Sequence, residues 1–157
     1  MRVRRAEHGD EGLLRELRVR ALTEAPEAFS ATIEQEHART DAQLQRWFTG
    51  RSTVMILDDG GAAMGLTAVA PVLDAPTVAS LLSMWVDPLA RKRGGGLLLV
   101  ETACKWARKN GYGEIRLHVY EPNTAARALY ERTGFTVQGR RTPDPNRPDQ
   151  LEMRRPL

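Results

Sequence analysis

A long apolar segment that runs into a basic, glycine-rich turn limits the possible folds of this chain more than any other feature. Thr77 to Val86 is mostly apolar and predicts a buried strand, which Asp87-Pro88 ends. The turn from Arg91 to Gly96 has three basic residues followed by three glycines. Apolar residues at helical spacing then predict a helix from Gly95 to Asn110. A strand, a glycine turn and a helix in this order indicate a layered α/β structure.

The glycine turn has the features of a binding site for phosphate groups. Unpaired N–H groups at a helix start attract anions, and glycines allow a diphosphate to approach the backbone closely. Arg91, Lys92 and Arg93 add formal positive charge. The P-loop pattern is absent, and the dinucleotide pattern fails because Leu99 replaces its last glycine. The turn predicts a bound pyrophosphate, and the alternative is a turn that only packs a helix on a sheet.

The other segments show alternating strand and helix patterns. The strand patterns are Val3–Glu7, Ser52–Leu57, Ala62–Ala70, Glu114–Tyr120, Phe135–Arg140 and Leu151–Arg154. The helix patterns follow the capping residues Asp10, Thr40 and Asn123. Turns are expected at Asp58–Gly61 and Pro71–Pro76, and Pro26 predicts a loop or broken helix from Ala25 to Arg39.

This order of elements predicts a single α/β (α+β) domain over residues 1–157. We expect a mixed, mostly antiparallel sheet of about six to seven strands with about four helices, because the pattern lacks the regular strand–helix alternation of a doubly wound parallel sheet.

Composition indicates an ordinary globular protein and excludes several classes. No run approaches the roughly 18 apolar residues of a membrane span, and the basic start Met1–Arg5 leads into polar residues, unlike a signal peptide. The single cysteine, Cys104, excludes an internal disulfide and is expected to be inert core. With a net charge of +3 and dispersed arginines, we expect a cytoplasmic protein without a nucleic-acid or membrane partner.

Two motifs identify a family resemblance. The turn reads R-x-x-G-x-G from Arg91 to Gly96, and Val119 to Phe135 reads V-Y-E-P-N-T-A-A-R-A-L-Y-E-R-T-G-F. The chain thereby resembles the GCN5-related N-acetyltransferase (GNAT) superfamily, whose second signature, V-x-x-x-N-x-x-A-x-x-L-Y-x-x-x-G-F, matches at every fixed position. The resemblance covers essentially the whole chain and is weakest from Ala21 to Thr53.

The resemblance implies an N-acetyltransferase that uses acetyl-CoA as cosubstrate, without a metal, and transfers the acetyl group directly to a primary amine in a ternary complex. It implies a variable acceptor-side segment at about 21–53 and an acetyl-CoA-binding core at about 77–136. Backbone groups of Met84 and Val86 would pair with the pantetheine arm, while Trp85 would point to the opposite face for packing. The implied cofactor-binding residues are Met84, Trp85, Val86, Arg91, Lys92, Arg93, Gly94, Gly95, Gly96, Leu97, Asn123, Ala126 and Arg127.

The resemblance also implies the catalytic residues. Tyr130, two helical turns after Asn123, would protonate the departing thiolate; the alternative is a core tyrosine. His118 stands where ribosomal-protein alanine N-acetyltransferases hold a glutamate proposed as base, and imidazole suits proton removal at neutral pH; the alternative is a structural histidine. Further candidates for the base, in the variable segment, are Glu34, Glu36 and His37.

The acceptor is left open by the sequence. A small-molecule amine is the leading interpretation, and the alternatives are a protein N-terminus or lysine, or a non-catalytic acetyl-CoA-binding module. By analogy with the family, Ala25 to Thr32 would form part of the acceptor wall, where Phe29 could line a pocket or fill the core. A homodimer is also left open.

Overall fold

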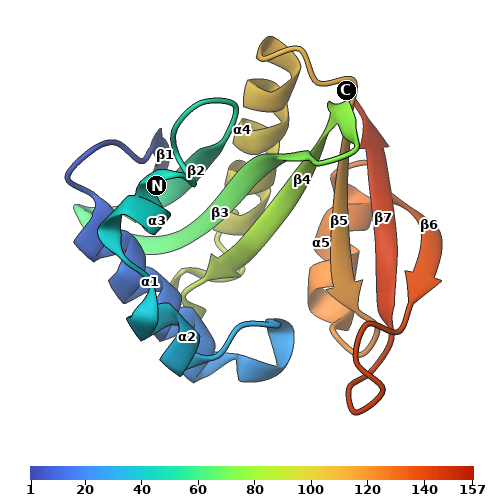
Figure 1. Ribbon diagram of the computed structural model, residues 1–157, viewed down its shortest axis with the longest axis horizontal. Coiled ribbons are helices and arrows are strands. Elements are labelled where there is room, and N and C mark those ends of the chain that lie inside the picture. Colours follow the sequence, from blue (N-terminus) through green and yellow to red (C-terminus); the bar gives the residue numbers. More distant parts are fainter.

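The computed structural model describes residues 1–157 and contains one seven-stranded sheet in the order β1-β2-β3-β4-β5-β7-β6 (Figure 1). The strands are β1 (Arg2–Arg5), β2 (Thr53–Asp59), β3 (Ala62–Val72), β4 (Ala75–Val86), β5 (Glu114–Tyr120), β6 (Thr136–Arg141) and β7 (Gln150–Pro156). Every neighbouring pair is antiparallel except β4 and β5, which are parallel. The predicted mixed, mostly antiparallel sheet is confirmed.

Five α-helices and two short 3₁₀ helices connect the strands. They are α1 (Glu11–Glu24), η1 (Pro26–Ala28), α2 (Ile33–Ala38), α3 (Asp41–Gln45), η2 (Pro88–Ala90), α4 (Gly95–Lys109) and α5 (Thr124–Arg132). Sequence reasoning missed α2, which lies in the segment expected to be a loop or broken helix. The signal was a capping box in which Thr32 and Gln35 exchange side-chain and backbone hydrogen bonds. None of the helices has both the length and the hydropathy that a membrane span requires.

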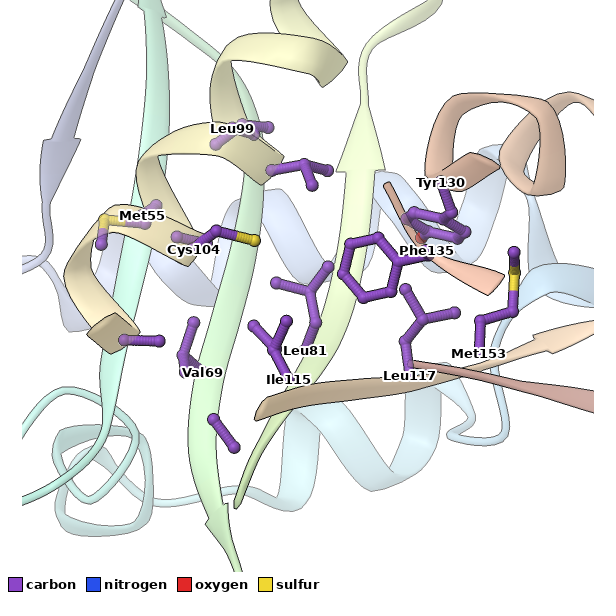
Figure 2. Close-up of a cluster of buried hydrophobic side chains, with 14 of the residues drawn as sticks. Met55, Val69, Leu81, Leu99, Cys104, Ile115, Leu117, Tyr130, Phe135 and Met153 are labelled. Carbon is purple, nitrogen blue, oxygen red and sulfur yellow. The ribbon is translucent and has the colours of Figure 1, made fainter. Parts of the chain in front are cut away.

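The sheet separates two hydrophobic cores. The larger core joins α4 and α5 to the sheet and contains Cys104, Ile115, Leu117, Tyr130 and Phe135 (Figure 2). The smaller core lies on the opposite face, where α1 packs on β2, β3 and β4. Burial in the larger core raises the pKa of the Cys104 thiol to about 11, so this cysteine is a packing residue, as predicted.

The first strand and the first helix differ in detail from expectation. Asp10 precedes α1 but makes no side-chain cap. Its carboxylate instead accepts hydrogen bonds from Arg4 at 2.7 and 2.9 Å and from the N–H of Glu7 at 2.9 Å. The bond from Arg4 holds the pKa of Asp10 below its usual value. Because the Glu7 amide turns toward Asp10, β1 ends at Arg5 and not at Glu7.

The turn between β3 and β4 is also shorter than expected. The predicted turn from Pro71 to Pro76 shrinks to Leu73 and Asp74, because pairing continues through Pro71 with Ala79 and through Val72 with Ala75. A proline is tolerated here because the pairing of β3 with β2 ends at Val69 and the register with β4 shifts after Pro71, and prolines in sheets occur at such edges and bulges.

The parallel strands β4 and β5 separate along their length, as Figure 1 shows. They pair only where Val78 to Ser80 lie beside Glu114 to Arg116. Beyond these residues β4 continues to Val86 and β5 to Tyr120 without pairing to each other. The facing edges therefore carry backbone N–H and C=O groups that have no partner in the sheet, and such groups are available to a ligand.

Candidate active site

A β-bulge lies in β4 where it runs past the end of its pairing with β5. Ser83 has a φ of 56°, which is uncommon for a residue with a side chain. The pairing with β3 shifts at the same place, between Leu66 and Ala68, and the Thr67 hydroxyl donates to the Leu82 carbonyl at 3.0 Å. Sequence reasoning missed the bulge because serine does not favour positive φ.

The bulge changes which residues of β4 face each core. Ala79 and Leu81 belong to the larger core before it, and Met84 and Val86 pack against the same core after it. Trp85 consequently lies on the opposite face, in the smaller core, as predicted. Its indole N–H donates to Glu24 at 3.0 Å, so the Trp85 side chain points away from the side on which Met84 and Val86 lie.

The glycine turn leads directly into the N-terminus of α4. Lys92 and Gly94 have positive φ, of 60° and 88°, and Gly94 precedes the helix without a side-chain cap. The first helical bond of α4 runs from the Leu98 N–H to the Gly94 carbonyl. The N–H groups of residues 95 to 97 therefore have no helical partner, which is the arrangement that binds anions at helix N-termini.

The turn carries less free charge than its sequence indicates. Arg91 donates to the Val86 carbonyl at 2.9 Å and to the Glu24 carboxylate at 2.6 and 3.1 Å. Arg93 pairs with Asp59 at 2.6 Å. Of the three basic residues of the turn, only Lys92 has no acidic partner. Two distant carboxylates, which local sequence cannot reveal, neutralise the arginines.

The two sequence motifs meet at the start of α4. A Cβ atom on Gly96 would lie 3.0 Å from Leu129 of α5 and 3.6 Å from Met84 of β4, so the turn, the helix of the second motif and the end of β4 converge there. Gly95 also has a packing role, since a Cβ would lie 2.6 Å from Leu57 of β2. Leu97 is about half exposed at this end of α4.

Asn123 begins α5, the helix that meets the start of α4 at Leu129. The Asn123 side chain accepts from the Ala126 N–H at 3.3 Å, which confirms its predicted role as N-cap of α5. Ala126 packs against the larger core. Arg127 is ion-paired with Glu131 at 2.8 Å one turn along the helix. Arg127, predicted to bind the cofactor, therefore has an acidic partner within α5.

Tyr130 is a core residue that keeps a free hydroxyl group. Its ring packs edge-on against Phe135 with centroids 5.8 Å apart (Figure 2), and burial raises its pKa above the usual value. The hydroxyl makes no hydrogen bond within the protein. The fully enclosed side-chain atoms that lack a hydrogen-bond partner are Arg18 Nη1, Glu36 Oε1 and Arg39 Nε. The Tyr130 hydroxyl oxygen is not one of them. The phenol is therefore protonated at neutral pH, and its oxygen reaches accessible space.

His118 lies on the face of β5 opposite to Tyr130. Its Nε2 is 3.6 Å from Oε2 of Glu152, the residue across from it on β7. Partial burial lowers the pKa of His118, and the charge of Arg141 lowers it further, while Glu152 acts in the opposite direction. The imidazole is therefore neutral at pH 7, which is the state that accepts a proton.

The candidates for the base in the variable segment separate into two groups. Glu36 is fully buried and lies 3.3 Å from Arg18 and 3.6 Å from Arg39, so it is a structural ion-pair partner. Glu34 and His37 are exposed on α2.

A contact that sequence reasoning missed ties the variable segment to the end of β5. Arg147, in the loop between β6 and β7, stacks 4.3 Å from the Tyr120 ring centroid. Its terminal nitrogens donate to the carbonyls of Phe29 at 2.8 Å and Glu27 at 3.1 Å. The Tyr120 hydroxyl lies 3.3 Å from the Ser30 hydroxyl. The end of β5 is therefore bordered by the η1 segment and the β6–β7 loop. The Phe29 ring itself packs against the smaller core.

Comparison with known proteins identifies the family. Residues 16–135 match the model of the acetyltransferase (GNAT) family, and the chain belongs to this family. It is similar to the mycothiol acetyltransferases of Beutenbergia cavernae, with 34% identity over 120 residues, and Salinispora arenicola, with 33% over 122 residues. Each match covers 76% of this chain and 39% of the relative, so the chain spans about two fifths of the length of these relatives.

Solved structures share the whole fold. A GCN5-related N-acetyltransferase from Kribbella flavida superposes with a TM-score of 0.81 and 28% identity, covering 99% of this chain and 97% of that one. The GNAT-family acetyltransferase from Streptococcus pneumoniae gives a TM-score of 0.83 at 20% identity, covering 99% and 98%. The latter likeness, at this identity, concerns the fold alone.

Proposed function

We propose that the protein is an acetyl-CoA-dependent N-acetyltransferase that acetylates a primary amine of a small molecule. The observation that carries this proposal is the separation of β4 from β5 next to the open N-terminus of α4. It combines unpaired strand edges with an anion-binding helix end, which together suit a ligand that has both an amide-containing arm and a diphosphate. Acetyl-CoA is such a ligand. Relatives named for a small molecule, mycothiol, support the small-molecule acceptor.

In this proposal the cofactor lies along the edge of β4 that β5 leaves free. The pyrophosphate binds the N–H groups at residues 95 to 97. Lys92 adds the one positive charge of the turn that has no acidic partner. The pantetheine amides pair with backbone groups of β4 near Met84 and Val86. A backbone N–H beyond the Ser83 bulge stabilises the thioester oxygen as it gains negative charge.

The chemistry needs one proton acceptor and one proton donor. The amine nitrogen attacks the thioester carbonyl carbon, and the C–S bond breaks as the C–N bond forms. His118 takes the proton that the amine loses, through a water molecule, and the Tyr130 hydroxyl gives a proton to the coenzyme A thiolate. The two residues lie on opposite faces of β5, so a group held between β4 and β5 is reached from both sides.

Two other functions give different outcomes in one assay. A protein acetyltransferase would modify peptides and not free amines, and a non-catalytic module would bind acetyl-CoA without turning it over. The test measures release of free coenzyme A thiol from acetyl-CoA with amines, aminoglycosides, amino acids, polyamines and peptides. Release with a small amine is expected. Binding of acetyl-CoA without release under any condition would support the module, and release with peptides alone would support the protein acceptor.

The pH dependence of turnover tests the role of His118. Because burial and Arg141 lower its pKa, we expect kcat/KM to rise with pH and to level off with an inflection below the ordinary histidine value of about 6.5. His118→Ala should remove this inflection. A structural histidine would instead lower the melting temperature upon replacement and leave the profile unchanged, so both quantities are measured. An unchanged inflection in His118→Ala would move the base role to another residue or to solvent.

A further inference from the structure

Three arginines lie on the same face of the sheet as His118, with most of their hydrogen-bonding capacity unused. Arg116 donates through Nε to Glu114 at 2.6 Å, and Arg141 through Nε to Gln150 at 2.7 Å. Arg154 donates through Nε to Glu152. In each case the Nε bond orients the guanidinium group, while both terminal nitrogens make no hydrogen bond within the protein. A guanidinium presented in this way can bind a carboxylate through two parallel bonds.

The strand register places these side chains on both sides of His118. Arg116 on β5 is directly opposite Arg154 on β7, and the next pair on the same face is His118 with Glu152. Arg141 on β6 is opposite Gln150, which places it on this face also. Positions two residues apart on a strand are roughly 7 Å apart. Arg116 and Arg154 therefore lie one residue pair from His118 on one side, and Arg141, beyond β7 on β6, lies one pair along on the other side.

This face is accessible and positively charged. The other face of β5 and β7 is covered, because Ile115, Leu117 and Met153 pack in the larger core with α4 and α5. The side chains of Arg116 and Arg154 are 27% and 36% exposed, so a ligand can reach their terminal nitrogens. The acidic residues of the face, Glu114 and Glu152, are already paired. Three guanidinium groups against two carboxylates leave a net positive charge beside a neutral histidine.

We propose that Arg141, the one arginine of this face without an acidic partner, binds a carboxylate of the acceptor, so that the acceptors are primary amines that carry a carboxylate close to the amine, as amino acids do. This inference rests on the proposed acetyl transfer and specifies its substrate class. Arg141 holds the carboxylate and leaves the amine beside His118, toward the edge where β4 and β5 separate.

The first test compares acceptors that differ only in the carboxylate. Coenzyme A release is measured with glycine, β-alanine, 4-aminobutyrate and a set of L-amino acids, each beside its own amide. We expect kcat/KM to be at least about tenfold higher for the acid with the preferred spacing than for its amide, because the amide lacks one charge-assisted hydrogen bond. Equal or faster turnover of the amides, or no turnover of any acid, would overturn the inference. Acetyl-CoA affinity, measured separately by calorimetry, tests the proposed function independently.

The second test removes single guanidinium groups. Arg141→Gln is expected to raise KM for the best acid by about 10- to 100-fold and KM for its amide much less, measured near pH 8, where His118 is neutral with or without the charge of Arg141. Arg140→Gln is the matched control, because Arg140 is the neighbour of Arg141 on β6 but pairs with Glu121 at 2.7 Å. Equal losses for acid and amide, or an effect of Arg140→Gln as large as that of Arg141→Gln, would contradict a carboxylate site.

Discussion

Replacing Gly94 by glutamate is expected to abolish acetyl-CoA binding in a protein that still folds. Gly94 precedes the open N-terminus of α4 with a φ of 88°. Its hypothetical Cβ has no neighbour within 4 Å, so the added side chain meets no packed core. The carboxylate would lie where the diphosphate is proposed to bind and would itself satisfy the free N–H groups. We expect the affinity for acetyl-CoA, measured by calorimetry, to fall by at least about a hundredfold. This is more than the loss of one charged hydrogen bond would typically cause.

Gly94→Asn is the control for this experiment. Asparagine tolerates positive φ better than other residues with side chains and adds no charge. It should therefore share the backbone strain of the glutamate variant while keeping most of the affinity. If the folded Gly94→Glu protein binds acetyl-CoA as tightly as the wild type, the diphosphate does not bind at this turn. If Gly94→Asn loses affinity equally, the backbone strain and not the charge is responsible.

Tyr130→Phe is expected to lower kcat by about 10²- to 10⁴-fold, the range for loss of a general acid. The Tyr130 hydroxyl has no hydrogen bond within the protein, and the ring packs against Phe135. Phenylalanine keeps this packing and removes only the proton. The melting temperature and the acetyl-CoA affinity should therefore stay near the wild-type values, so that the loss is confined to turnover.

Tyr112→Phe provides a matched control in the same core. Tyr112 is buried like Tyr130, but its hydroxyl donates to the Arg51 carbonyl at 2.8 Å. Its replacement should lower the free energy of unfolding by about 1 kcal/mol, the net value of such a bond, with little effect on kcat. An unaffected kcat in Tyr130→Phe, measured in single-turnover experiments so that product release cannot mask the chemical step, would reject Tyr130 as the acid.

Local chemistry made much of the fold predictable from the sequence. The Asp58–Gly61 turn, the capping box of Thr40 and Gln43, and the end of α4 before Gly111 each depend on residues a few positions apart. The glycine turn and the signature from Val119 to Phe135 are continuous segments as well. Because hydrophobic periodicity and turn chemistry operate over short spans, the order of elements and the family resemblance follow from them.

The sequence by itself thus determined the elements, their order and the two motifs, whereas only the tertiary structure decided which charges are free and where. Glu24 is 67 positions from Arg91, which it neutralises, and Arg147 is 118 positions from the Phe29 carbonyl that it binds. The Ser83 bulge depends on the register with β3, and the arginine face on the registers among β5, β7 and β6. Such contacts arise from strand pairing between distant segments, and residue patterns along the chain contain no local signal for them.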